Sequence, residues 1–176
     1  KTFQLLTQAV GRAGRGALPG EAVIQTYQPE HYAVVHAVAQ NYEGFYGEEI
    51  IYREMMGYPP VSHMLAVQIF SKNEERGRRL ADALAKLTGQ FPEGDTARGA
   101  GETGRKPSDG LKKLQIIGPA PASIGRINDI FRFVFYVKDA KYGKLVQIKD
   151  MLEEKMKTYQ SSDELVQFDF NPVNTM

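Results

Sequence analysis

Cysteine and tryptophan are both absent from this chain of 176 residues. Without cysteine, the chain can form no disulfide framework, no thiolate zinc site and no cysteine nucleophile. An excess of either charge is missing as well, because 22 Lys and Arg residues balance 21 Asp and Glu residues to a net charge of +1. This balance excludes a globally basic nucleic-acid-binding protein, so any contact with a polyanion must come from a local patch.

Long hydrophobic runs are absent too. No segment has the length of a membrane span and no signal-peptide pattern is present, so we expect a cytoplasmic protein without membrane contact. The composition, 42% hydrophobic and 24% charged, is typical of a folded chain of one domain or two small ones. The chain starts at Lys1 inside a helical pattern, so we expect it to be a piece of a longer protein.

The first 60 residues combine helical and extended patterns. The predicted elements are a helix over 2–15, a strand over 22–27, a helix that opens at Pro29 and Glu30, and a helix over 43–56 that stops before Pro59-Pro60.

The pattern changes after Pro60. It predicts strands over 64–71, 114–118, 130–138 and 165–170, and helices over 74–90 and 141–157. The order β-α-β-β-α-β is that of a ferredoxin-like α+β domain, whose two helices pack on one face of the sheet and leave the other face free. The glycine-rich stretch 92–110 predicts a flexible insertion. Its G-x-G-x-x-G at 99–104 has polar loop on both sides, not the strand and helix of a dinucleotide site.

The segment 8–16 carries the sharpest chemical pattern. On a helix, Gln8, Arg12 and Arg15 fall on the face opposite the apolar residues. Two guanidinium groups and an amide on one face can bind a polyanion bidentately. The two glycines between them cost about 1 kcal/mol each in a helix, which makes sense where backbone or ligand approaches closely. The alternative is an ordinary surface helix with solvated arginines.

This segment resembles motif VI of superfamily 2 helicases. Nearly the whole chain resembles the primosomal protein N′ (PriA) family of bacterial replication-restart helicases, and the 92–110 stretch is the main departure. The motifs that carry this second resemblance are Pro19-Gly20, Ile24-Gln25-Thr26-Tyr27, Pro29-Glu30-His31-Tyr32, Tyr58-Pro59-Pro60, Gly118-Pro119-Ala120-Pro121 and Phe168-Asp169-Phe170-Asn171-Pro172.

The resemblance implies a domain plan and a nucleotide site. Residues 1–44 would be a remnant of a RecA-like second helicase lobe, 45–60 a helical linker, and 61–176 a DNA- and protein-binding domain. The catalytic and ATP-contacting residues would be Gln8, Gly11, Arg12 and Arg15, which would meet the γ-phosphate as arginine fingers do. ATP and Mg²⁺ would be held by a first lobe, whose phosphate-binding loop is not in this sequence, so we expect no hydrolysis by this chain alone.

Metal chemistry is not expected in this chain. The resemblance implies a zinc-binding cysteine cluster in the full protein, but no cysteine is present here. The three histidines, His31, His36 and His63, lack the spacing of a metal site, and we expect surface or packing roles for them.

The strand over 130–138 offers two different faces. Phe131, Phe133, Phe135 and Val137 share one face, which we assign to the core. The opposite face carries Arg132, Tyr136 and Lys138, and with Arg126 it could form a basic, aromatic platform for a DNA strand or branch. The alternative is that this face docks on the helicase lobe.

The resemblance also implies partners for residues 61–176. These are forked or single-stranded DNA, other primosome proteins and the acidic tail of single-stranded-DNA-binding protein, with Lys141 at a helix start as a candidate carboxylate contact. A second hypothesis is an independent ferredoxin-like binding module that has no ATP-linked role.

Overall fold

A computed structural model describes residues 1–13, 20–92, 113–159 and 163–173. The chain divides into two compact units, 1–52 and 53–176, and the division falls inside the expected linker over 45–60. No described helix is long and apolar enough to cross a membrane. The stretch 93–112, which holds most of the predicted insertion, lies outside the described residues, as do Arg15 and the 99–104 glycine motif.

The first unit is built from helices. These are α1 (Thr2–Val10), α2 (Tyr32–Val38) and most of α3 (Tyr42–Met56). Its small core contains Phe3, which stacks on Phe45 with ring centroids 4.2 Å apart. A Cβ atom at Gly44 would lie 2.5 Å from the His36 ring, so a larger residue there would have to displace that ring and the Asn41 side chain.

Two predictions for this unit are wrong. The predicted helix over 2–15 is α-helical only to Val10, and the N–H groups of Arg12 and Ala13 then bond to carbonyls three residues back, as in a 3₁₀ turn. The predicted strand over 22–27 does not form, and the Val23 side chain is 86% exposed. A strand needs a neighbour to accept its hydrogen bonds, and the described part of this unit holds none.

The second helix begins later than expected. It starts at Tyr32 rather than at Pro29 and Glu30, because the Nδ1 atom of His31 accepts a hydrogen bond from the N–H of Ala33 at 3.1 Å. The side chain thereby caps an otherwise unpaired donor of the first turn.

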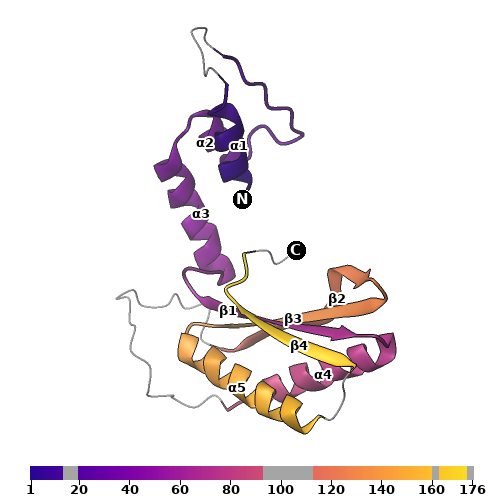
Figure 1. Cartoon of the computed structure of the whole chain (residues 1–176). Coiled ribbons are helices and arrows are strands. Elements are labelled where there is room, and N and C mark those ends of the chain that lie inside the picture. The colour runs from indigo at the N-terminus through magenta and orange to yellow at the C-terminus, as the bar shows by residue number, and fades with distance from the viewer. Residues whose placement is uncertain (14–19, 93–112, 160–162, 174–176) are drawn as a thin grey trace. The chain divides into compact units, whose positions relative to one another are not determined.

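The second unit has the predicted β-α-β-β-α-β order. Its elements are β1 (His63–Ser71), α4 (Glu74–Gly89), β2 (Gln115–Ile127), β3 (Ile130–Asp139), α5 (Tyr142–Thr158) and β4 (Glu164–Phe170). The strands form one antiparallel sheet in the order β2-β3-β1-β4. Both helices lie on one side of it (Figure 1), so the ferredoxin-like prediction is confirmed.

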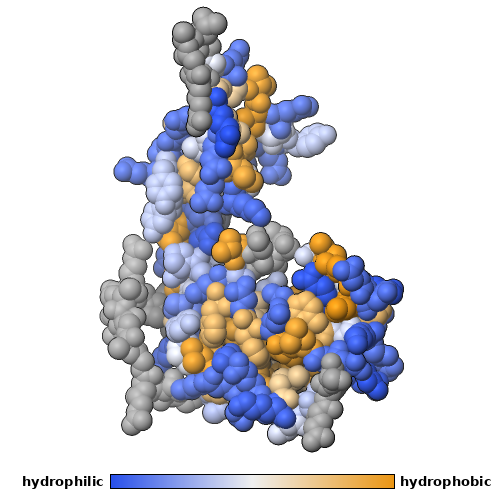
Figure 2. Space-filling model, viewed as in Figure 1, coloured by the Kyte–Doolittle hydropathy of each residue, from blue (hydrophilic) through white to orange (hydrophobic). Residues whose placement is uncertain are grey.

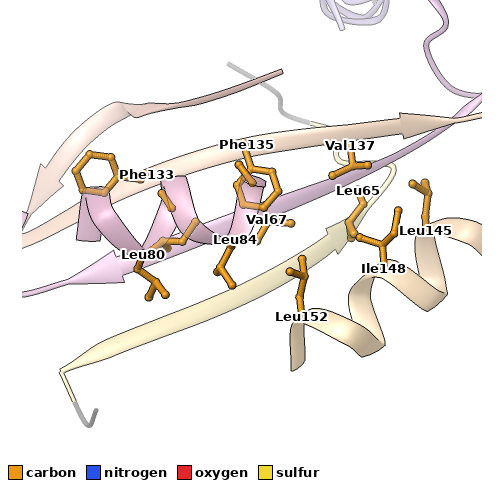
Figure 3. Close-up of a cluster of buried hydrophobic side chains, with 13 residues drawn as sticks. Leu65, Val67, Leu80, Leu84, Phe133, Phe135, Val137, Leu145, Ile148 and Leu152 are labelled. Atoms are coloured by element: carbon orange, nitrogen blue, oxygen red, sulfur yellow. The ribbon is translucent and has the colours of Figure 1, made fainter. Parts of the chain in front are cut away.

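The core of this unit lies between the sheet and the two helices (Figure 3). As predicted, Phe133, Phe135 and Val137 of β3 face it, with Phe131 packed at its edge. The fully buried side chains from the other elements include Leu65, Val67, Ile69, Leu84, Leu145, Ile148 and Leu152.

The strand β2 is longer than predicted. The expected strand over 114–118 ended at Pro119, whereas β2 runs to Ile127 at the edge of the sheet. An edge strand tolerates proline, because the missing N–H group would point away from the sheet. Gly118 has a φ of +95°, and the pairing with β3 shifts register twice along β2.

An asparagine ends β4. Asn171 has a φ of +50°, its N–H group donates to the Met64 carbonyl at 2.7 Å, and its Oδ1 atom accepts from the Met64 N–H at 2.9 Å. The side chain thus supplies the acceptor that a further strand residue would have supplied.

The buried leucine of α5 provides a test of the core. Leu152→Ala should lower the free energy of unfolding of the second unit by about 2–5 kcal/mol, because it leaves a cavity among fully buried side chains. Urea unfolding followed by circular dichroism measures this loss. Leu165→Ala is the matched control, since the Leu165 side chain is 55% exposed and its loss should change stability by less than about 0.5 kcal/mol. Equal effects of the two substitutions would contradict this core.

Candidate functional site

The polar residues of the 8–16 segment lie at and just after the end of α1. Gln8 is in the last helical turn, Gly11 caps the helix in a right-handed conformation (φ −67°, ψ −6°), and Arg12 follows in the turn. All three are exposed, and the Gln8 and Arg12 side chains make no hydrogen bond or ion pair with the described residues. The amide and one guanidinium are therefore available to an external anion.

Gly11 also has a local structural reason. A Cβ atom at this position would lie 3.1 Å from the carbonyl oxygen of Thr7, which is tighter than an ordinary contact. Packing between successive turns at the end of α1 is therefore one reason for a glycine here, independent of any ligand.

An open cavity of about 510 Å³ lies in the first unit. The described residues that line it carry no charge and are Val10, Ala13, Gly20, Ala22, Ile24, Thr26, Pro29, Val34, Val38 and Gln40. A triphosphate needs cations or a cradle of backbone N–H groups. The described lining therefore supplies no cation to a triphosphate.

The histidines are engaged in local contacts. His36 pairs with Glu48 at 3.0 Å, and His63 packs edge-on against Tyr142. Burial lowers the pKa of His63, and the nearby Asp139 carboxylate opposes that shift. Among the described residues, no group of three or more histidine or acidic side chains could hold a metal ion.

The structure separates the four residues of the predicted DNA platform. Arg132 lies on the open face of the sheet, where its guanidinium sits over the Phe70 ring at 5.4 Å. Arg126 is paired with Phe131, so it lies towards the helix-covered face, with its guanidinium 4.9 Å from the Phe131 ring. It also forms an ion pair with Asp129.

Lys138 is on the predicted open face but is buried. Its side chain is 3% exposed, and its ammonium donates to the Met56 carbonyl at 3.2 Å and lies 3.6 Å from the centroid of the Tyr58 ring. Burial lowers the pKa of Lys138, and burial together with the neighbouring Tyr58 raises the pKa of Tyr136. Tyr58 thus covers this end of the open face, and Lys138 holds the end of α3 to the sheet.

The rest of the open face is mainly apolar. Its exposed or half-buried apolar side chains include Phe70, Ile117, Ile127, Ile130, Val134 and Leu165, and its polar ones, besides Arg132, include Gln68, Gln167 and Asp169. Hydrophobic residues reach the surface among hydrophilic ones over this unit (Figure 2). Phe70 was missed by the sequence analysis, although the alternation of 64–71 would have placed it opposite the core side chains.

Lys141 lies at the N-cap position of α5 and is exposed. Its N–H group donates to Oδ1 of Asp139 at 2.9 Å, and the other oxygen of that carboxylate pairs with Lys144 at 3.1 Å. A carboxylate of the chain itself therefore already occupies the start of α5.

Comparison with known proteins assigns the second unit to a family. The family model "Primosomal protein N C-terminal domain" matches residues 54–173, nearly the whole second unit. The chain belongs to this family. The resemblance seen in the sequence is therefore confirmed, and the family is one of replication restart proteins.

Curated relatives of the family align over most of the chain. "Replication restart protein PriA" from Synechocystis sp. is 35% identical over 82% of this chain and 15% of the relative. The proteins of the same name from Bacillus subtilis and Thermotoga maritima are 30% and 41% identical over 100% and 78% of this chain, and 20% and 16% of the relatives. The chain spans at most a fifth of the length of these three relatives.

The buried ammonium of Lys138 predicts a pH-dependent stability. Its lowered pKa means that the folded protein releases this proton before the unfolded chain does, between the lowered value and the ordinary value of 10.5. The unfolded chain binds more protons in that window, so stability rises with pH there. Wild type should therefore gain free energy of unfolding relative to Lys138→Met as the pH is raised from about 8 to about 10.

Urea unfolding of both proteins at each pH measures this difference, and the contribution of Tyr136 cancels because both proteins contain it. Lys86→Met, on an exposed part of α4, controls for the loss of one lysine. A wild-type advantage that stays constant or shrinks with pH would contradict the assignment.

Proposed function

We propose that this chain is the C-terminal portion of an ATP-dependent DNA helicase that restarts stalled replication forks and assembles the primosome with other proteins. The observation that carries this proposal is the match of residues 54–173 to the primosomal protein N C-terminal domain. The much greater length of the relatives supports a parent protein with further domains.

The proposed ATP contact uses Gln8, Gly11, Arg12 and Arg15. The exposed amide and guanidinium at the end of α1 suit a γ-phosphate brought by another part of the protein. The described lining of the neighbouring cavity offers no cation, so other parts of the protein would supply the remaining phosphate and Mg²⁺ contacts. Arginine stabilises the charge that spreads over the transferred phosphoryl group. Any zinc would sit in a cysteine cluster outside this chain.

A substitution of Arg12 tests this role. In the full-length helicase, Arg12→Ala should reduce DNA-stimulated ATP hydrolysis by roughly a thousandfold, the scale of an arginine-finger loss. The measurement is phosphate release with saturating forked DNA. Arg79→Ala, an exposed arginine of α4 paired with Glu75, is the matched control and should leave the rate unchanged. A wild-type rate for Arg12→Ala would remove this residue from the nucleotide site.

The second unit is proposed to contact branched or single-stranded DNA through the open face. Phe70 offers a ring on which a base can stack, and Arg132 beside it offers a charge to a phosphate. Lys138 and Tyr136 would support this platform from its covered end, and Arg126 would reach a phosphate only from the other face. The acidic tail of single-stranded-DNA-binding protein is proposed as a second ligand, with the Lys141 side chain as a contact.

DNA binding by this face predicts a change in salt dependence. Arg132→Ala should weaken binding of the chain to forked DNA and reduce the slope of log K against log salt by about 1, because one phosphate contact is lost. Fluorescence anisotropy over a range of salt concentrations measures both values, with Arg79→Ala as the control. An unchanged slope would show that Arg132 neutralises no phosphate.

A second candidate function is a protein-docking module without an ATP-linked role. The mainly apolar open face, with Leu165 55% exposed and Ile117 44% exposed, favours a protein surface over a polyanion. In that case Arg132→Ala would leave the DNA slope unchanged, while charged substitutions at Ile117 would disrupt docking.

A further inference from the structure

The two edges of the sheet differ in how they are protected. An exposed edge strand carries unpaired N–H and C=O groups, which proteins usually shield with proline, lysine or bulges. The edge strand β2 has such protection, since it contains Pro119 and Pro121 and two register shifts. The opposite edge strand, β4, has no proline, lysine or register shift, and its charged residues are the buried Glu164 at its start and the exposed Asp169.

The strand β4 runs for seven residues, ELVQFDF, without proline, glycine, lysine or arginine. Its pairing with β1 is unbroken from Glu164 to Phe170, and within the described residues it pairs with no other strand. Such a strand is a ready template for one more strand.

The direction of its free groups follows from the hydrogen bonds at its end. The N–H of Asn171 bonds to Met64, so alternation along an antiparallel ladder directs the groups of Asp169, Gln167 and Leu165 towards β1. The N–H and C=O groups of Val166 and Phe168 then point outwards. These two residues would form the hydrogen bonds to an added strand.

The side chains around this edge define what would fit. Val166, Phe168 and Phe170 are half-buried at the rim of the helix-covered core, and Phe170 contacts Tyr142 with ring centroids 5.1 Å apart. Side chains directly opposite one another in an antiparallel pair share a face. Apolar residues opposite Val166 and Phe168 would therefore extend this core rim.

The open-face side of β4 adds a charge preference. Asp169 is exposed and has no ion-pair partner among the described residues, and the only other charge on the strand is Glu164. Self-pairing of two β4 strands would add the acidic charges of two copies without any basic residue. A strand with lysine or arginine on this face would instead be attracted.

We propose that the outer edge of β4 binds an extended peptide segment of a partner protein as an additional antiparallel strand. The segment carries alternating apolar residues towards the helix side and basic residues on the open face beside Asp169. This surface is distinct from the Arg132–Phe70 platform, so an experiment can refute peptide binding at β4 without refuting DNA binding at the open face.

The test uses the whole 176-residue chain and capped seven-residue peptides of alternating valine and lysine, labelled for fluorescence anisotropy. Binding is expected, with clearly weaker binding of the matching valine–glutamate peptide. N-methylation of the valine nitrogens should abolish binding, because these N–H groups would meet β4, whereas N-methylation of the lysine nitrogens should be tolerated. Equal binding of the two charge variants, or of the two methylated peptides, would overturn the proposal.

Two substitutions test the protein side. Val166→Pro removes an outward N–H group without removing a bond to β1 and should weaken binding by at least about tenfold. Asp169→Asn should lower the preference for the lysine peptide about threefold, whereas Asp82→Asn, an exposed carboxylate of α4, should not change it.

Circular dichroism checks that Val166→Pro is folded. If that variant unfolds, the methylated peptides decide the outcome alone. Concentration-dependent dimerisation of wild type without peptide binding would identify a second copy as the occupant and overturn the proposal.

Discussion

The pairing of β1 with β3 is the constraint on which the second unit depends. Nine successive residue pairs join these two central strands, from His63 opposite Asp139 to Ser71 opposite Phe131. Because side chains alternate between the faces of a strand, a slip by one residue would exchange the buried and open faces. The same register that buries Val67 against Phe135 also brings Phe70 beside Arg132. The core and the candidate DNA surface are therefore two results of one alignment.

Several motifs that carried the family resemblance in the sequence serve the fold in this structure. Tyr58 of the Tyr-Pro-Pro motif covers the ammonium of Lys138, and the carbonyl of Pro59 accepts a hydrogen bond from Arg53. Gly118 has a φ of +95°, which side-chain-bearing residues rarely adopt, and a Cβ atom there would lie in a tight contact 3.1 Å from the Val134 carbonyl oxygen. Family membership and functional role are thus separate inferences. A motif that supports the resemblance can have a structural role without a ligand contact.

Most of the second unit could be predicted from the sequence, because β3 places Phe133, Phe135 and Val137 on one face and α4 and α5 bury regular apolar stripes. Three features could not be predicted. The length of β2 depends on its position at the sheet edge, where prolines are tolerated. The face of Arg126 depends on register shifts, and the burial of Lys138 depends on a tyrosine 80 positions earlier in the sequence. In the first unit, the run 22–27 has strand-like composition but no neighbouring strand to pair with.

The strand order has a consequence for biosynthesis. The central strand β1 is the first of the four along the chain, yet its partners β3 and β4 follow only after α4 and most of the domain. A ribosome therefore exposes β1, with its unpaired backbone and apolar side chains, long before either partner has been made. Pairing strands that are far apart in the sequence also lowers the conformational entropy of the intervening chain before the contacts that offset this loss have formed. The second unit can complete its sheet only when β4 has left the exit tunnel, so the edge of β1 that faces β4 stays unpaired until the end of the domain's synthesis.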